Sequence, residues 1–515
     1  MNLLRRQILT AAALLCALLL SGCAERIVFS EKNVPVTAET VRLRLQSGET
    51  ALLDRLTGLR RADFSGSLCY DELLAWAEAH PEVDTRYTVA LPDGRLVDNS
   101  EEYLDLSGLD SALAGETAEL LPYLPALKRV ELGGGLSPAA LGCFGLVRPD
   151  IRYSGSFTLG GEERRINETS LSLPGLRAAE IVKFRQLLPV MTALERVDLG
   201  SQELSPELHF DDIAAFQALR PETVFAFDFM LFGREFSTTD REMDLDHVPM
   251  SDGGAAVREA ISCMPELAYL DMDSCGVSDE EMAAIRDDFP DVNVVWRIWF
   301  GTGYSVRTDV EKILASQPSK GGALTPANTQ SLKYCTKVKY LDLGHNPLLT
   351  DISFVSYMPE LEVLIVAMDN WSDASPLADC PKLEYLELQT SQLSDLSPLS
   401  GLKELKHLNI GYLFGLKDIS PLYGLSQLER LWIGCLSPVP PEQVETMREN
   451  APNCEINTTT FDPCEGGWRY IGYDEAACRQ IPAPRYALLA EQFGYASGDF
   501  SFSWLDPEYL SLIHI

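Results

Sequence analysis

The stretch LEYLELQTSQLSDLSPL, from Leu383 to Leu399, is one of a series of similar segments in the second half of this 515-residue chain. Related segments begin at Val338, Leu361, Leu405 and Leu428, so that successive starts are 23, 22, 22 and 23 residues apart. Leucines alternate with polar residues at the start of each segment, which is the pattern of a short strand with one buried face. One such turn is too thin to bury its apolar edge alone, so the pattern predicts turns that stack on their neighbours.

The shared pattern LxxLxLxxNxLxDIxPL closely resembles the leucine-rich repeats of bacterial internalins. The resemblance implies an α/β fold, a right-handed leucine-rich repeat solenoid with one short parallel strand per turn and helices on the convex side. It also implies an asparagine in each turn that binds loop amides. The positions that match it are Asn346, Asp369, Ser391, Leu413 and Leu436. The asparagine ladder is therefore expected only at the start of this series.

A longer repeat precedes the short one. Its leucine-rich segments begin at Leu59, Leu127, Leu194 and Leu267. Between them lies a helix-like stretch that ends in proline, with an acidic residue next in most copies. The prolines are Pro81, Pro149, Pro221 and Pro290, and a degenerate copy carries Pro452. Because both elements recur about every 70 residues, we predict long repeats that lead into the short ones.

A run of alternating apolar and polar residues follows each of these first four prolines, as in FPDVNVVWRIWFG from Phe289 to Gly301. The alternation predicts a strand, and the run is longer than a solenoid strand requires. Each run meets a glycine and then a polar return, so we predict a β-hairpin inserted into each N-terminal repeat. The run is too short to span a membrane and contains Arg297. Trp296 and Trp299 could contact a partner or pack between the hairpin arms, and we expect packing.

The first 23 residues, MNLLRRQILTAAALLCALLLSGC, predict where the protein is located. Two arginines precede an apolar run from Ile8 to Leu20, which is typical of a secretory signal and too short for a stable transmembrane helix. The residues from Leu20 to Cys23 resemble the bacterial lipobox, which implies cleavage before Cys23 and lipidation of its sulfur. The alternative is a plain signal peptide with an incidental cysteine. We expect a bacterial protein on the extracytoplasmic face of the cell membrane, held there by its lipid anchor.

These patterns divide the chain into six parts. They are a signal peptide (1–22), a lipidated linker (23–40), long-period leucine-rich-like repeats with hairpin arms (41–330), internalin-type repeats (331–440), a C-terminal cap with an unassigned segment (441–509) and residues 510–515. The last part, LSLIHI, matches the translation of a transposon-end sequencing adapter. We therefore expect that the natural protein continues beyond this point.

The charge balance and the missing motifs exclude several functions. Aspartate and glutamate number 76 against 42 lysines and arginines, and a net charge of −34 argues against nucleic acid as a partner. The sequence contains no recognisable nucleophile or zinc motif. The segment from Asp271 imitates a calcium loop but has Met282 where a bidentate glutamate is needed. We expect no catalytic residue, cofactor or metal. Cys454, Cys464 and Cys478 could include a disulfide, with the pairing open.

The candidate partner-binding residues follow from the resemblance, since the outward strand residues of leucine-rich repeats commonly contact partners. Carried over by register, the candidates are Tyr340, Asp342, Tyr385, Glu387, His407, Asn409, Arg430 and Trp432. Exposed Tyr340, Tyr385 and Trp432 would form an aromatic patch of the kind that anchors protein interfaces. The alternative is that these aromatic side chains only stabilise the sheet by cross-strand packing.

The predicted function is that of a surface-exposed, lipid-anchored leucine-rich repeat protein that binds a protein or peptide and does not catalyse a reaction. One alternative is the scaffold portion of a truncated surface enzyme, whose catalytic domain would lie beyond Leu510. Another is a structural spacer of the cell envelope.

Overall fold

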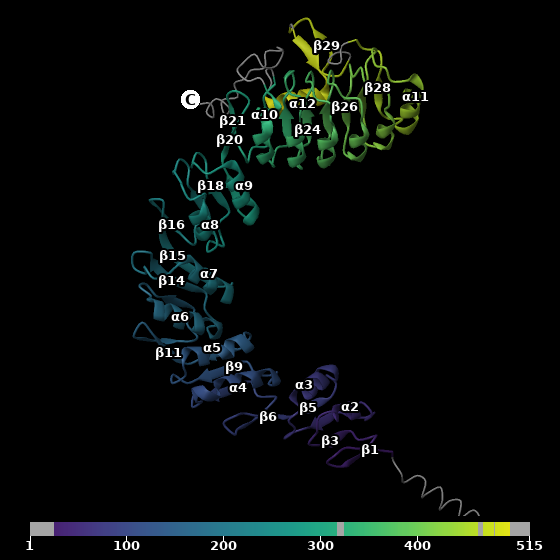
Figure 1. The fold of residues 1–515 in the computed structure, drawn as a ribbon. Coiled ribbons are helices and arrows are strands. Elements are labelled where there is room, and N and C mark those ends of the chain that lie inside the picture. The colour runs from purple at the N-terminus through teal and green to yellow at the C-terminus, as the bar shows by residue number, and fades with distance from the viewer. Residues whose placement is uncertain (1–24, 317–323, 462–466, 478, 495–515) are drawn as a thin grey trace, which may run out of the picture. The chain divides into compact units, whose positions relative to one another are not determined.

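The computed structural model describes residues 25–316, 324–461, 467–477 and 479–494 (Figure 1). Contacts divide the chain into a first unit, 1–240 with 259–266, and a second unit, 241–258 with 267–515. The predicted signal peptide, the lipidation site Cys23 and residues 510–515 lie outside the described residues.

The first unit repeats a sheet of three parallel strands. After the hairpin β1 (Arg26–Val28) and β2 (Asn33–Pro35), the sheets are β3 (Thr40–Arg42), β4 (Arg61–Asp63) and β5 (Asp84–Arg86); β8 (Tyr103–Leu106), β9 (Arg129–Leu132) and β10 (Arg152–Ser154); and β13 (Ser170–Ser172), β14 (Arg196–Ser201) and β15 (Val224–Leu231). The helices are α2 (Thr50–Leu53), α3 (Tyr70–Ala79), η1 (Ser111–Leu113), α4 (Ala114–Leu120), η2 (Leu121–Tyr123), α5 (Pro138–Val147), α6 (Ala178–Leu187), η3 (Leu188–Val190) and α7 (Phe210–Leu219). The middle residue of nearly every parallel strand is buried, as the alternation predicts.

The predicted hairpin insertions are confirmed in the N-terminal repeats. They are β6 (Thr88–Ala90) with β7 (Leu96–Asp98), β11 (Ser156–Leu159) with β12 (Glu162–Arg165), β15 with β16 (Arg234–Ser237) and, in the second unit, β20 (Arg297–Phe300) with β21 (Tyr304–Arg307). Each turn contains a glycine with positive φ, such as Gly94 at 88°, a conformation in which a side chain would be strained. The long alternating run is usually split into a short parallel strand and a separate arm. Trp296 is buried as expected, but the expectation for Trp299 is wrong, since its side chain is 60% exposed.

The second unit contains a small sheet and a longer one. The small sheet is β17 (Glu242–Asp244), β18 (Tyr269–Asp271) and β19 (Asn293–Val295). The longer one, called the main sheet below, has seven strands: β22 (Lys312–Leu314), β23 (Tyr340–Asp342), β24 (Val363–Ile365), β25 (Tyr385–Glu387), β26 (His407–Asn409), β27 (Arg430–Trp432) and β28 (Glu455–Asn457). All neighbouring strands of the main sheet are parallel.

The core of the main sheet is a continuous row of aliphatic side chains. Leu386, Leu408 and Leu431 are register partners on adjacent strands, and each is fully buried. The part of the chain that the structure describes is therefore a leucine-rich repeat solenoid, in which each turn is covered by the turn beside it.

Helices cover the other side of these turns. They are α8 (Ala255–Ile261), through which the boundary between the units passes, α9 (Asp279–Asp288), α10 (Pro326–Thr329), η5 (Gln330–Tyr334), η6 (Ser353–Tyr357), η7 (Ser375–Asp379), η8 (Ser397–Gly401), η9 (Ser420–Gly424) and α11 (Pro441–Asn450). The turns of 22 or 23 residues use 3₁₀ helices of five residues, most of which begin with a proline in their first turn. Within the described ranges, none of the helices combines the length and apolar character needed to cross a membrane.

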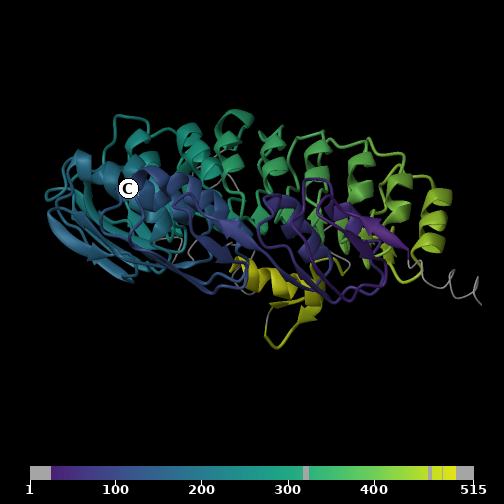
Figure 2. The ribbon, with the colours of Figure 1, turned by 90° about the horizontal axis from the view of Figure 1, so that it is seen from below.

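A final segment folds back onto the main sheet. It comprises β29 (Tyr470–Asp474), β30 (Arg479–Pro482) and α12 (Pro484–Phe493). Figure 2 shows the yellow α12 and its hairpin on the side of the main sheet opposite the green 3₁₀ helices. We call residues 467–477 and 479–494 the cover segment.

Candidate functional site

The strand register places the candidate residues in two columns, as predicted. The first residues of the strands pair in the order Tyr340, Val363, Tyr385, His407 and Arg430, and the third residues in the order Asp342, Ile365, Glu387, Asn409 and Trp432. Both columns lie on one face of the main sheet, because side chains alternate along a strand. We call this surface the column face.

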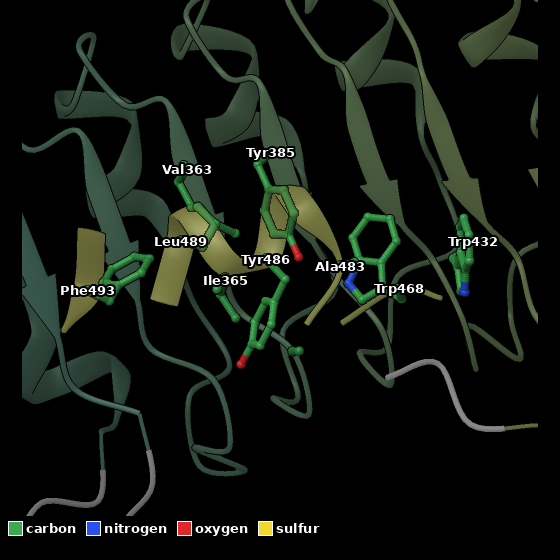
Figure 3. Packing of buried hydrophobic residues seen from close by; sticks show 10 residues of the cluster. Val363, Ile365, Tyr385, Trp432, Trp468, Ala483, Tyr486, Leu489 and Phe493 are labelled. Carbon is green, nitrogen blue, oxygen red and sulfur yellow. The ribbon is translucent and has the colours of Figure 1, made fainter. Parts of the chain in front are cut away.

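The expected exposure of these residues is wrong. Tyr385, Glu387, Asn409 and Trp432 are fully buried, Asp342 and His407 are nearly so, and Tyr340 and Arg430 are half-buried. The physical reason is the cover segment, whose apolar side chains pack on the column face. The shared cluster is Val363, Ile365, Ala367, Tyr385, Trp432, Trp468, Ala483, Tyr486, Leu489 and Phe493 (Figure 3).

Glu387 is the polar centre of this interface. Its carboxylate accepts a hydrogen bond from Trp468 Nε1 at 2.9 Å and one from Arg469 Nε at 3.3 Å, and it also accepts from Arg469 Nη2. On the sheet itself, Gln389 Nε2 donates at 2.9 Å and the Tyr385 hydroxyl also donates. The carboxylate therefore has both a cation and several neutral donors, the condition under which a buried charge is tolerated.

The charge on Glu387 depends on the cover segment. Burial by itself raises the pKa of Glu387, but the nearby guanidinium of Arg469 and the hydrogen bonds from Arg469, Tyr385 and Gln389 outweigh it, so the pKa is lowered. Burial also raises the pKa of Tyr385 well above its ordinary value. The pair is therefore a carboxylate with a neutral phenol at neutral pH.

A second polar anchor lies near the C-terminal end of the main sheet. The guanidinium carbon of Arg430 lies 4.7 Å from the ring centroid of Trp432 and 4.9 Å from that of Trp468. Arg430 also donates to the backbone oxygens of Gly467 and Trp468. Trp468 packs on Tyr385 as well, with ring centroids 5.4 Å apart. The Trp468 side chain thus joins β25 and β27, which lie on either side of β26, to the cover segment.

The helix α12 extends the contact toward the start of the main sheet. Gln492 Nε2 donates to the Tyr340 hydroxyl at 3.1 Å, and the Phe493 and Tyr340 rings meet edge to face at 6.2 Å. Leu489 and Tyr486 lie over Val363 and Ile365 in Figure 3. The cover segment is therefore held by aromatic packing along its length and by buried charge at its start.

The column face has the chemistry of a peptide-binding surface. It offers aromatic and aliphatic side chains, the Glu387 carboxylate for a guanidinium or indole N–H, and the Arg430 guanidinium for backbone oxygens. Among the described residues, no group of three or more histidine, cysteine or acidic side chains could hold a metal ion. In the calcium-like segment, Asp271 is paired with Arg307 at 2.9 Å and Asp273 with Arg297 at 3.0 Å.

Of the three cysteines considered for a disulfide, one lies among the described residues. Cys454 is a free thiol, and burial raises its pKa to about 12. Cys464 and Cys478 lie outside the described residues.

Three residues of this site were not predicted from the sequence: Trp468, Arg469 and Tyr486. They belong to the segment that could not be assigned, because it has no repeat register. One signal was present in the column face itself, since Val363, Ile365 and Trp432 are unusually apolar for a surface open to water. A second signal was the single glutamate, Glu387, in the same columns.

No protein-family model matches the chain, and no curated protein matches it. Among solved structures, the chain is similar to an internalin of Listeria monocytogenes, with 15% identity, a TM-score of 0.24, and coverage of 84% of this chain and 86% of that one. It is also similar to a leucine-rich repeat protein of Leptospira interrogans, with 14% identity, a TM-score of 0.25, and coverage of 81% and 93%.

Proposed function

We propose that this chain is a bacterial surface protein, anchored by lipid at Cys23, that binds a protein or peptide through the column face and does not catalyse a reaction. One observation carries the proposal: the column face already holds a peptide, the cover segment, through the buried contacts of Glu387 with Trp468 and Arg469. A surface that recognises aromatic and guanidinium groups of its own chain is complementary to the same groups on a partner.

The partner in this proposal carries a tryptophan or another large aromatic residue next to an arginine. Such a partner competes with the cover segment, because both need the same carboxylate. A tethered segment has an effective concentration that is roughly millimolar, so the closed form favours its own segment over a dilute ligand. Partner binding is therefore expected to be weak until the cover segment is loosened.

Binding can be tested by competition between the cover segment and a free peptide for the column face. In the chain from Glu25 onward, Trp468→Ala combined with Arg469→Glu removes the indole and places a negative charge beside Glu387. A labelled peptide of residues 467–494 should bind this variant much more tightly than it binds the unchanged chain. The matched control is Tyr473→Ala, because Tyr473 lies on the same segment and its side chain is 58% exposed.

The same variant then serves to capture a partner from cell-surface proteins. The supporting result is a protein retained by the opened variant and released by the free 467–494 peptide. The proposal fails if the labelled peptide does not bind the opened variant, since the column face would then have no affinity for a peptide in trans.

The anchor has a separate test. Cys23→Ser in the full-length chain should move the protein from the membrane fraction to the medium, because two or three acyl chains are what hold a lipoprotein on the bilayer. If the serine variant stays with the membranes, the anchor at Cys23 is wrong, whatever the column face binds.

A further inference from the structure

A polar pocket lies in the first unit, far along the chain from the column face. It has a volume of about 620 Å³ and lies where the sheet of β8, β9 and β10 gives way to the sheet of β13, β14 and β15. The hairpin β11–β12 leaves the solenoid between these sheets, so β10 and β13 are not paired with each other. The pocket is the gap in the parallel sheet that this insertion creates.

Two arginines of adjacent strands line this pocket. Arg129 begins β9 and Arg152 begins β10, and the two are register partners on parallel strands. Their Cα atoms are therefore about 4.8 Å apart, and both side chains are exposed on the same face. Like charges at directly opposite positions repel each other, which is a cost to the sheet unless an anion lies between them.

Neither arginine forms a close ion pair within the described ranges, although the carboxylates of Glu131 and Glu195 also line the pocket. Among the described residues, no carboxylate oxygen lies within 4.0 Å of either guanidinium. The guanidinium carbon of Arg129 lies 5.5 Å from the centroid of the Tyr103 ring, and the charge of Arg129 makes a small contribution to lowering the pKa of Glu102. The carboxylate of Glu131, the nearest candidate along the strand, accepts a hydrogen bond from the Ser154 hydroxyl. This is unusual in a chain with 76 acidic and 42 basic residues.

The rest of the lining is hydrophilic. Asn167, Thr169 and Thr192 contribute amide or hydroxyl groups, and Glu195 contributes a carboxylate. Alanine is the largest aliphatic residue in the lining. Sites for peptides need large apolar anchors in desolvated pockets, and the large side chains of this lining are two tyrosines, Tyr103 and the buried Tyr153. A ligand with many hydroxyl groups fits the lining better than a peptide does.

We propose that this pocket binds an acidic sugar, with the carboxylate of a hexuronate held between Arg129 and Arg152. Guanidinium groups bind carboxylates through paired, charge-assisted hydrogen bonds, and two of them on adjacent strands can hold one carboxylate from both sides. Glu195, Asn167 and Thr169 are placed to bind sugar hydroxyls. The volume falls within the range of ordinary ligand sites, about 300–1,000 Å³, and leaves room for more than one sugar ring.

The test is a calorimetric titration of the chain from Glu25 onward with digalacturonate. We expect saturable binding that weakens roughly 10- to 100-fold in Arg129→Gln combined with Arg152→Gln, because two charge-assisted contacts are lost. The neutral methyl ester of the same disaccharide should bind as weakly to the unchanged protein as the acid binds to this variant.

Arg196→Gln is the matched control. Arg196 begins β14 as Arg129 begins β9, is also exposed, and does not line the pocket. It should leave digalacturonate binding unchanged. Thermal unfolding should be nearly the same for all three proteins, since the substituted side chains lie at the surface.

Three results would overturn the proposal. They are no saturable binding of digalacturonate, equal binding by the double-glutamine variant, and tighter binding of a triglutamate peptide than of the disaccharide. The last result would assign the arginine pair to acidic peptides.

Discussion

Arg469 donates from Nε to the carboxylate of Glu387, 82 residues earlier in the chain, at a distance of 3.3 Å, and also donates from Nη2. This buried ion pair joins the cover segment to the middle of the main sheet. Burial of either charge without the other is unfavourable, because the charge loses its hydration and has no opposite charge to offset that loss. The pair therefore couples the position of the cover segment to the charge of a single glutamate.

The first prediction concerns this coupling. Arg469→Ala should detach the cover segment, because leaving Glu387 buried without a cation would cost about 3–5 kcal/mol and detachment lets water reach it. The amides of α12 should lose their protection from hydrogen exchange, while those of β25 and β26 keep theirs. Replacing both charges, as Glu387→Gln with Arg469→Leu, should restore part of the protection, because no buried charge remains and the amide oxygen can still accept from Trp468 Nε1.

Tyr473→Ala is the control for the same measurement. It shortens an exposed side chain of the cover segment and should leave the exchange of α12 unchanged. If α12 stays protected in Arg469→Ala, the ion pair does not hold the cover segment.

The second prediction compares one substitution at two glycines of the first unit. Gly145 lies in α5, and a Cβ there would be 1.9 Å from the backbone oxygen of Pro189 in η3. Gly145→Ala must push the two elements apart, so we expect the free energy of unfolding to fall by about 3 kcal/mol or more. Gly115 lies in α4 with nothing within 4 Å of its Cβ position. Gly115→Ala should instead stabilise by about 0.5–1 kcal/mol.

Urea unfolding of the two variants measures both effects. The same chemical change should shift the midpoint in opposite directions, downward for Gly145→Ala and upward for Gly115→Ala. Equal shifts would mean that α5 and η3 are not packed as closely as described.

The sequence predicted the repeats well because their signal is local and recurrent. The register that pairs Leu386, Leu408 and Leu431 was evident in the spacing of the leucines, and the hairpins were evident in alternation followed by glycine. Both follow from how a short segment buries one face, which neighbouring residues determine.

The cover segment could not be predicted in the same way. Its contacts join Trp468 and Arg469 to residues more than 80 positions earlier, and no periodicity records such a contact. The candidate columns were therefore placed correctly on the strands but wrongly assigned to solvent. Burial of Tyr385 and Trp432 is a tertiary property, decided by a segment without a repeat.

The third prediction concerns acid stability. His407 is buried beside Tyr385, and burial together with the charges of Arg430, Arg485 and Lys406 lowers its pKa to about 3. Its ordinary pKa is 6.5. Because the unfolded chain binds the proton more readily, the stabilising contribution is present above pH 6.5 and is lost as the pH falls toward 3.

His407→Gln should therefore flatten the acid side of the stability curve. We expect little change near pH 7.5 and a gain relative to the unchanged chain at pH 5, measured as the free energy of unfolding in urea. A constant difference between the two proteins across this range would contradict the shifted pKa of His407.

The last prediction concerns Asp369, which occupies the asparagine position of its turn. Its Oδ1 accepts from the backbone N–H of Asn346 at 2.6 Å, and its Oδ2 is buried without a hydrogen-bond partner. Burial raises its pKa from 3.8 to about 9, with a smaller contribution from the charge of Asp342 and an opposing one from the Asn346 hydrogen bond. The folded protein therefore holds a proton there that the unfolded chain releases.

The sign of the pH dependence follows from this difference. With the folded pKa raised, the contribution to stability is complete below pH 3.8 and is lost progressively as the pH rises toward 9. One proton corresponds to about 1.4 kcal/mol per pH unit over that window. Asp369→Asn replaces the carboxyl by an amide of the same shape that cannot ionise. The variant should therefore be more stable than the unchanged chain at pH 8, and the difference should shrink steadily toward pH 4.

Asp395→Asn is the matched control in the same solenoid. The carboxylate of Asp395 is exposed and accepts from the Ser397 backbone N–H at 2.8 Å, and hydrogen bonds from Ser397 lower its pKa. Its contribution is thus present at neutral pH and lost in acid, so this substitution should slightly destabilise the protein at pH 8 and have no effect near pH 3. If the two asparagine variants show the same trend with pH, the buried position of Asp369 is not what sets its charge.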